Sequence, residues 1–139
     1  MKNLVDEAVL TAVELLFVPY IWGGDSREGL DCSGFVGFLL RQVGLIPQGH
    51  DNTAQGYFEL FKNRTVNKPY GGCVIFYGKS VKKITHVMFA LTDKVCIGAV
   101  RGNRWMDTPA KARLRKARID VRDISYRSDI VAVVDPFLV

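Results

Sequence analysis

One cysteine of this chain lies where a fold can activate a nucleophile, at the predicted start of a helix. Apolar residues recur at helical spacing after Cys32, Asp31 occupies the N-cap position, and Gly44 supplies the stop. The free N–H groups and the positive dipole end of a helix start favour a thiolate in the first turn. We therefore predict a lowered pKa and a nucleophilic role for Cys32; the alternative is a small core residue, which free cysteines often are.

A cysteine nucleophile needs an imidazole that accepts its proton and returns it, and the chain has two histidines. His86 lies inside the apolar run 84–91, which is typical of a mostly buried strand. His50 follows a segment of loop composition, which predicts a surface position. His86 is therefore the candidate base, although a hydrogen-bonded core histidine would fit the same run.

Three sequence blocks together resemble the NlpC-type (NlpC/p60) peptidases, papain-like cysteine hydrolases that cut the stem peptides of bacterial peptidoglycan. The blocks are Pro-Tyr-Ile-Trp-Gly-Gly at 19–24, Asp-Cys-Ser-Gly-Phe at 31–35 and Thr-His-Val at 85–87. The resemblance implies that Cys32 attacks the amide carbonyl and that His86 acts as general base and then acid. It also implies that Tyr20 and the backbone around Cys32 help to hold the oxyanion, and that Asp31 and Ser33 line the pocket for the amino side of the peptide.

Two features depart from the family pattern. In the family, a polar residue on the strand after the histidine strand orients the imidazole, and that position falls at or near Gly98 here. An ordered water, a backbone carbonyl or a side chain such as Asn103 could hold the ring instead, since triads are recognised by geometry and role. We predict a polar atom within about 3 Å of the outer ring nitrogen of His86. The second departure, Gly-Gly-Cys at 71–73 in place of the usual Pro-Gly-Asp, affects a turn.

The elements that must position these residues are helices first and strands afterwards. Helical patterns cover 4–16 and 32–43, and a cap at 52–55 with Gln at the third helical position predicts a short helix that runs to about 62. Strand patterns cover 74–77, 85–91, 95–101, 117–121 and 130–135, with a hairpin connection at 92–94. This order predicts an α+β fold with an antiparallel sheet. The resemblance adds a papain-like arrangement, in which N-terminal helices pack on five or six strands and bring Cys32 to His86.

Length and composition favour a single domain spanning residues 1–139, because 139 residues of which 48% are hydrophobic can bury a core without disulfides. Three cysteines at these spacings predict neither a disulfide framework nor a zinc site, and we expect no metal and no other cofactor. Cys73 and Cys96 lie in apolar runs and are expected to be inert core residues.

The N-terminal sequence does not have the pattern of a secretory signal, and no apolar stretch reaches the roughly 20 residues of a membrane span. We therefore expect synthesis in the cytoplasm and action at the cell wall or in the periplasm. Release as a phage lysis protein, transport in a virion as a tail protein, or non-classical secretion would each bring such an enzyme to its substrate.

The formal net charge is +5, and the charges are unevenly distributed along the sequence. A basic cluster at 101–118 contains one acidic residue, Asp107. Its cations are Arg101, Arg104, Lys111, Arg113, Arg115, Lys116 and Arg118. A basic surface attracts anionic polymers such as those of the cell envelope, but a solvated loop and edge strand would explain the charges equally well. Nucleic acid is not an expected partner, because the sequence has no helix-turn-helix, zinc-finger or RNA-binding aromatic motif.

The function that these residues favour is hydrolysis of amide bonds in peptidoglycan stem peptides, with Cys32 as nucleophile and His86 as base. Two alternatives stay open. One is a catalytically weak module of the same fold that binds peptidoglycan or belongs to a phage tail. The other is hydrolysis or acyl transfer at a different amide, since one fold hosts many chemistries.

Overall fold

The first three helices precede the strands of the main sheet along the chain, as the sequence predicts. The computed structural model describes residues 3–138 and begins with helices α1 (Leu4–Glu14), α2 (Cys32–Gln42) and α3 (Ala54–Phe61), followed by the 3-10 turn η1 (Lys62–Arg64). A small hairpin of β1 (Asp25–Ser26) and β2 (Gly29–Leu30) precedes α2. No helix among these described residues is long and apolar enough to cross a membrane.

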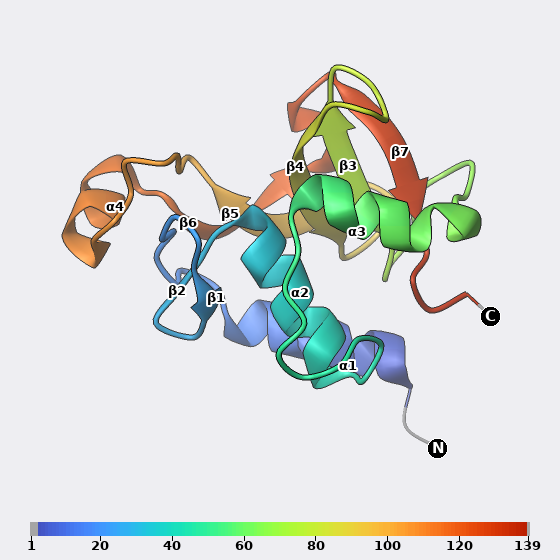
Figure 1. Cartoon of the computed structure of the whole chain (residues 1–139), viewed down its shortest axis with the longest axis horizontal. Coiled ribbons are helices and arrows are strands. Elements are labelled where there is room, and N and C mark those ends of the chain that lie inside the picture. The colour runs from blue at the N-terminus through green and yellow to red at the C-terminus, as the bar shows by residue number, and fades with distance from the viewer. Residues whose placement is uncertain (1–2, 139) are drawn as a thin grey trace.

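The main sheet has five antiparallel strands in the order β6-β5-β4-β3-β7 (Figure 1). The strands are β3 (Val74–Gly78), β4 (Ile84–Ala90), β5 (Val95–Val100), β6 (Arg118–Asp123) and β7 (Ile130–Val134), with the 3-10 turn η2 (Ile124–Tyr126) between the last two. Strands β3 to β6 form a meander, and β7 returns to pair with β3. The predicted α+β fold with an antiparallel sheet is confirmed.

The sheet buries both of its faces. On one face, apolar residues of α1, α2 and α3 form the larger core cluster with Val87 and Phe89 of β4. On the other face, Met88 and Ala90 of β4 join a smaller cluster. His86 has the same parity along the strand as Met88, because side chains alternate between the two faces of a strand. The candidate base therefore belongs to the face opposite to the one on which α2 packs.

Strands β4 and β5 separate before they end. Their pairing is limited to Phe89 with Ile97 and Ala90 with Cys96. The first half of β4 stays paired with β3, and β5 stays paired with β6 along its whole length. This divergence opens the sheet beside His86, where the start of α2 can reach the strand from the helical face.

The basic cluster contains a helix that the sequence does not predict, since no regular element is expected between the strands at 95–101 and 117–121. Helix α4 (Pro109–Arg115) begins after Thr108, whose hydroxyl accepts a hydrogen bond from the N–H of Lys111 at 3.2 Å. Only Ala112 of this helix is buried, so the segment lacks the wide apolar stripe from which a helix is predicted. In Figure 1, α4 lies at the outer end of the molecule, beyond β5 and β6.

Candidate active site

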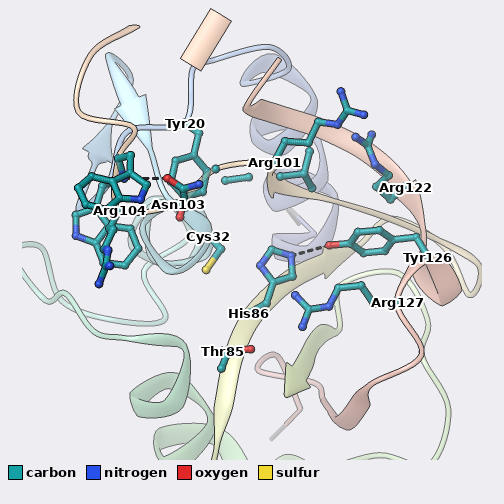
Figure 2. A pocket seen from close by; sticks show the side chains of 15 residues that line it. Tyr20, Cys32, Thr85, His86, Arg101, Asn103, Arg104, Arg122, Tyr126 and Arg127 are labelled. Atoms are coloured by element: carbon teal, nitrogen blue, oxygen red, sulfur yellow. Dashed lines mark hydrogen bonds between the residues drawn. The ribbon is translucent and has the colours of Figure 1, made fainter. Parts of the chain in front are cut away.

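An open cleft of about 680 Å³ lies where β4 and β5 diverge (Figure 2). It is built by the loop after α1, the first residue of α2, β4, the end of β5 with the loop that follows, and the segment from β6 through η2. The polar and aromatic residues of its wall are Tyr20, Trp22, Cys32, Thr85, His86, Arg101, Asn103, Arg104, Trp105, Arg122, Tyr126 and Arg127. The structure thus brings Cys32, His86 and Tyr20 into one cleft.

Cys32 is held at the cleft by the cap of its helix. Oδ1 of Asp31 accepts a hydrogen bond from the N–H of Gly34 at 2.7 Å, and Oδ2 accepts one from the N–H of Gly23 at 2.9 Å. One carboxylate therefore ties the helix start to the preceding loop. The half-buried Cys32 thiol also lies beside the backbone N–H of Val87, the residue that follows His86.

The protonation state of Cys32 differs from the sequence prediction. Burial, and after it the charge of Asp31, raises the pKa of the Cys32 thiol to about 11. The backbone N–H groups beside the sulfur act in the opposite direction, but the loss of hydration is the larger effect. The predicted lowering of the pKa is therefore wrong. The thiol is protonated at neutral pH, and its attack on a carbonyl requires a base.

The state of the thiol can be read from its alkylation. Iodoacetamide should modify Cys32 in the folded protein and should reach Cys73 and Cys96 only after unfolding, because both are fully buried. Since the thiolate is the nucleophile, the rate at Cys32 should rise about tenfold per pH unit from pH 7 toward the pKa of about 11. Mass spectrometry of the alkylated peptides over a pH series measures both effects. A rate that is already flat above pH 7 would show that the thiol is ionised at neutral pH.

His86 is neutral over the same pH range. It lies on β4 opposite Tyr77 of β3, with the two ring centroids 5.5 Å apart. Burial, and after it the positive charge of Arg127, lowers the pKa of His86 to about 4, while Asp129 opposes this shift. A neutral imidazole can accept a proton at neutral pH, so His86 has the state that a general base requires.

The outer nitrogen of His86 is held by a residue that the sequence analysis missed. The hydroxyl of Tyr126 lies 2.7 Å from Nε2 of His86, which meets the expectation of a polar atom within reach of the ring (Figure 2). Because Nε2 is engaged, Nδ1 is the nitrogen left for the Cys32 thiol. The described residues make no direct thiol–imidazole hydrogen bond; such bonds commonly tighten only in the complex with substrate.

Neither of the positions considered from the sequence holds the imidazole. A Cβ atom at Gly98 would lie 2.5 Å from Sδ of Met88, so the methionine fills the space that a third residue on β5 would need. Asn103 lines the cleft, but its Oδ1 accepts a hydrogen bond from the N–H of Trp105 at 2.9 Å. Tyr126 comes from η2 instead, and no spacing in the sequence points from His86 to that residue.

Tyr20 is buried against the loop after β5. Tyr20 lines the cleft together with the nucleophile, and its pKa is raised by burial and then by the neighbouring charges of Cys32 and Asp31. The ring packs on the backbone of Gly102, where an added Cβ would lie 2.1 Å from the ring. The absence of a side chain at Gly102 therefore lets the loop close over Tyr20.

This contact gives a stability prediction. Gly102→Ala should lower the free energy of unfolding by about 1–3 kcal/mol, because the new methyl group cannot fit unless Tyr20 or the loop moves. Hydrolysis should weaken as well, since both partners of the contact line the cleft. Thermal unfolding and initial rates measured on one preparation check the two effects. A variant with unchanged melting would mean that the ring of Tyr20 does not hold this loop.

Asp31 and Ser33 face a second hollow, of about 420 Å³, that shares Trp22 with the cleft. The hydroxyl of Ser33 donates to Oδ1 of Asp31 at 3.3 Å, and Asp51 lines the same hollow. Trp22 is 57% exposed and forms the boundary between the two spaces. Two carboxylates beside a hydroxyl suit a positively charged amino group.

The remaining candidates lie outside the cleft. His50 is half-buried in the loop before α3, with its ring centroid 6.2 Å from that of Tyr57, so its predicted surface position holds only in part. Cys73 and Cys96 are both buried in the smaller core cluster, as predicted. Of the basic cluster, Arg101 and Arg104 line the cleft, whereas Lys111 forms an exposed ion pair with Asp107 at 2.7 Å.

This arrangement has the parts that nucleophilic acyl transfer requires. Cys32 supplies a thiol, the neutral His86 can take its proton, and Tyr126 fixes the outer nitrogen of the ring. The N–H groups of Cys32 and Ser33 lie beside the sulfur, at a helix start whose first N–H groups have no partner within the helix. Such donors can stabilise negative charge that develops on a carbonyl oxygen.

Comparisons with known proteins give the same assignment. The chain is 34% identical over 110 residues to the probable peptidoglycan endopeptidase LytE of Bacillus subtilis, covering 73% of this chain and 31% of that protein. The chain therefore spans about a third of the length of this relative. The peptidoglycan hydrolase RipB of Mycobacterium tuberculosis has a similar structure, with a TM-score of 0.71 and 21% identity over 98% of this chain and 66% of that chain.

A second mycobacterial structure shows the same fold in another role. RipD of Mycobacterium tuberculosis, described as a non-catalytic NlpC/p60 domain protein adapted to peptidoglycan binding, matches with a TM-score of 0.64 and 14% identity over 96% of this chain and 98% of that chain. At these identities the two structures establish the fold alone. The sequence profile of the NlpC/P60 family matches residues 17–122, which is most of the chain. This chain is therefore a member of the NlpC/P60 family.

Proposed function

We propose that this protein is a cysteine hydrolase that cleaves amide bonds in the stem peptides of bacterial peptidoglycan. The observation that carries the proposal is the meeting of Cys32 and His86 in one open cleft, with Tyr126 2.7 Å from the outer nitrogen of the imidazole. Membership of the NlpC/P60 family and the endopeptidase relative support peptidoglycan as the substrate.

The protonation states define the first chemical step. Nδ1 of His86 takes the proton of the Cys32 thiol as the sulfur attacks the amide carbonyl, because the free thiol is not ionised at neutral pH. The resulting imidazolium donates through Nε2 to the hydroxyl of Tyr126 and returns its other proton to the leaving amine. Water, deprotonated by the same imidazole, then attacks the thioester, and the thiol is released with the carboxylic acid product.

The tetrahedral intermediates carry a negative oxygen that needs donors. The backbone N–H groups of Cys32 and Ser33 are proposed for this role, together with the phenol of Tyr20. The raised pKa of Tyr20 keeps its O–H protonated and able to donate. Asp31 and Ser33 are proposed to receive the amino side of the stem peptide in the neighbouring hollow.

The proposed place of action is the cell wall, where this substrate is found. Delivery by phage lysis or in a phage tail stays a prediction, as does attraction of the basic surface to anionic envelope polymers.

Digestion of purified peptidoglycan tests the proposed function. The wild-type protein should release soluble fragments with new amino and carboxyl termini within the stem peptide, which mass spectrometry identifies. Cys32→Ser should release none, since an unactivated hydroxyl is a much poorer nucleophile than a thiol. Equal release by both proteins would remove Cys32 from the mechanism.

The alternative function is a module that binds stem peptides without cutting them. It is favoured by the raised pKa of Cys32, which gives no resting thiolate, and by the use of a tyrosine to hold the imidazole. Binding of stem peptide with no fragments formed between about pH 5 and pH 10, where His86 stays neutral, would establish this function.

A further inference from the structure

The cleft wall carries positive charge that the proposed chemistry does not use. Four arginines line the cleft, and within residues 3–138 no Asp or Glu side chain does so. Arg127 is paired with both carboxylate oxygens of Asp129, and Arg122 shares Asp120 with Arg118 at 3.3 Å. Arg101 forms no ion pair with any residue that the structure describes. Its guanidinium is therefore available to a ligand of the cleft.

The backbone around Arg101 is fixed in place. Arg101 itself has φ of +65°, a conformation that costs energy for a residue with a side chain. The next residue, Gly102, packs on the ring of Tyr20, and the N–H of Trp22 donates to the carbonyl of Met106 at 2.8 Å. The loop is thus anchored at both ends to the segment that precedes the nucleophile. A fixed loop presents its charge at a defined position, which reduces the entropic cost of binding.

Arg101 and Arg122 occupy one side of the cleft. Figure 2 shows both side chains on the opposite side of Cys32 from Arg104. Arg104 stacks on Trp105, with its guanidinium 4.8 Å from the ring centroid. Arg122 is half-buried at the wall beside Tyr126, on whose phenol its charge acts. Two guanidinium groups on one wall of a cleft favour an anionic group of the ligand.

The acidic residues near the nucleophile lie elsewhere. Asp31 and Asp51 line the second hollow, beyond Trp22, whereas Arg101 and Arg122 line the cleft and not that hollow. If the hollow receives the amino side of the substrate, the cleft receives the part that leaves with the amine. The charges therefore favour a substrate that is positive at one end and negative on its leaving side.

We propose that Arg101, together with Arg122, is the subsite for a free carboxylate on the leaving side of the scissile amide. This inference rests on the proposed function and adds a substrate requirement to it. The planar guanidinium can bind a carboxylate through two parallel hydrogen bonds, which distinguishes it from a neutral carboxamide of the same shape. A phosphate-bearing wall polymer would also attract these arginines, but their place in the cleft with the thiol indicates a group on the substrate itself.

A pair of synthetic stem peptides tests the subsite. The peptides are identical except that the leaving-side carboxylate is free in one and amidated in the other. The wild-type enzyme should favour the free acid by about tenfold or more in kcat/KM, since a hydrogen bond to a charged group is worth about that factor. Arg101→Gln should lose most of this preference, and Arg115→Gln, an exposed residue of α4 outside the cleft, should keep it.

Binding to Cys32→Ala protein, measured by calorimetry, gives a readout that does not depend on catalysis. The free acid should bind more tightly than the amide, and adding Arg101→Gln should abolish the difference. Arg122→Gln should reduce it, and thermal melting reports whether that variant is folded. Binding of polyglycerol phosphate to the same variants is measured as well, because this polymer represents the phosphate-bearing wall polymers that could attract the arginines.

The outcomes separate the two proposals. Hydrolysis of both peptides at equal rates by wild type and Arg101→Gln would overturn the carboxylate subsite and leave the proposed function intact. If neither peptide is hydrolysed but the free acid binds tightly and in an Arg101-dependent way, the proposed function would be wrong and the carboxylate subsite would be supported. Arg101-dependent binding of polyglycerol phosphate, with no preference between the peptides, would assign these arginines to a wall polymer and overturn the inference.

Discussion

Replacing His86 with glutamine should lower kcat/KM for stem-peptide hydrolysis by about 10³-fold at neutral pH, because positioned proton transfer contributes roughly 10²–10⁴ to a rate. The size of this loss follows from the protonation state of the Cys32 thiol. With a pKa of about 11, Cys32 is almost entirely protonated near pH 7, and among residues 3–138 His86 is the one base that lines the cleft with it. Glutamine keeps a polar side chain beside Tyr126 and disturbs the strand little. Initial rates on a defined stem peptide measure the loss.

The pH dependence distinguishes a general base from a preformed thiolate–imidazolium pair. The deficit of His86→Gln should shrink as the pH approaches about 11, because the thiolate then forms without a base. The wild-type rate should fall on the acid side as His86 is protonated near pH 4. His50→Gln is the matched control, since that histidine lies outside the cleft, and should keep the wild-type rate. A deficit that stays constant from neutral pH to about pH 10 would contradict the general-base mechanism.

The order and type of most elements could be predicted because each carries a local pattern. The apolar stripe of the first helix, the Asp31 cap and the strand runs correspond to α1, α2 and β3 to β7, with ends shifted by one or two residues. The helix in the basic cluster could not be predicted in the same way, because a helix with one buried residue has no periodic apolar signal. Its cap at Thr108 and the proline that follows were the only local signs.

The presence of Cys32 and His86 in one cleft could be inferred from residue types and family resemblance, since the chain has few candidates for each role. The residue that binds the outer nitrogen of the imidazole could not be inferred in this way. Met88 fills the space that a side chain at position 98 would need, and that packing depends on contacts between strands rather than on local sequence. Tyr126 reaches His86 from a turn forty positions away. A contact of that kind follows from the register of the folded sheet.

The pKa of Cys32 shows a different limit of sequence reasoning. A helix start does favour a thiolate, and the N–H groups that express this effect lie beside the sulfur. Burial is not visible from the motif, and here it outweighs those donors, with the adjacent Asp31 adding to the shift. The same aspartate that caps the helix therefore disfavours the thiolate. As a result, the proposed mechanism depends on His86 and on the group that orients it.

Replacing Tyr126 with phenylalanine should lower kcat about tenfold with little change in KM, because the ring of His86 loses its hydrogen bond while the cleft keeps its shape. In the proposed mechanism, Nε2–H donates to the phenol oxygen and stabilises the imidazolium. Removing that acceptor lowers the pKa of His86, so the acid limb of the rate profile should move below pH 4. A shift to higher pH would show instead that the Tyr126 hydroxyl donates to the neutral imidazole.

Tyr70→Phe supplies the matched control for this prediction. It removes the same hydroxyl from a tyrosine that donates to Asp135, away from the cleft. That variant can lose stability, but its kcat and its pH profile should equal those of the wild type. The phenylalanine at 126 keeps the edge-to-face packing on Tyr77, whose ring centroid lies 5.7 Å from that of Tyr126, so the fold should persist. Unchanged kcat and an unmoved acid limb in Tyr126→Phe would mean that His86 holds its orientation through packing alone, and Tyr126 would then have no part in the reaction.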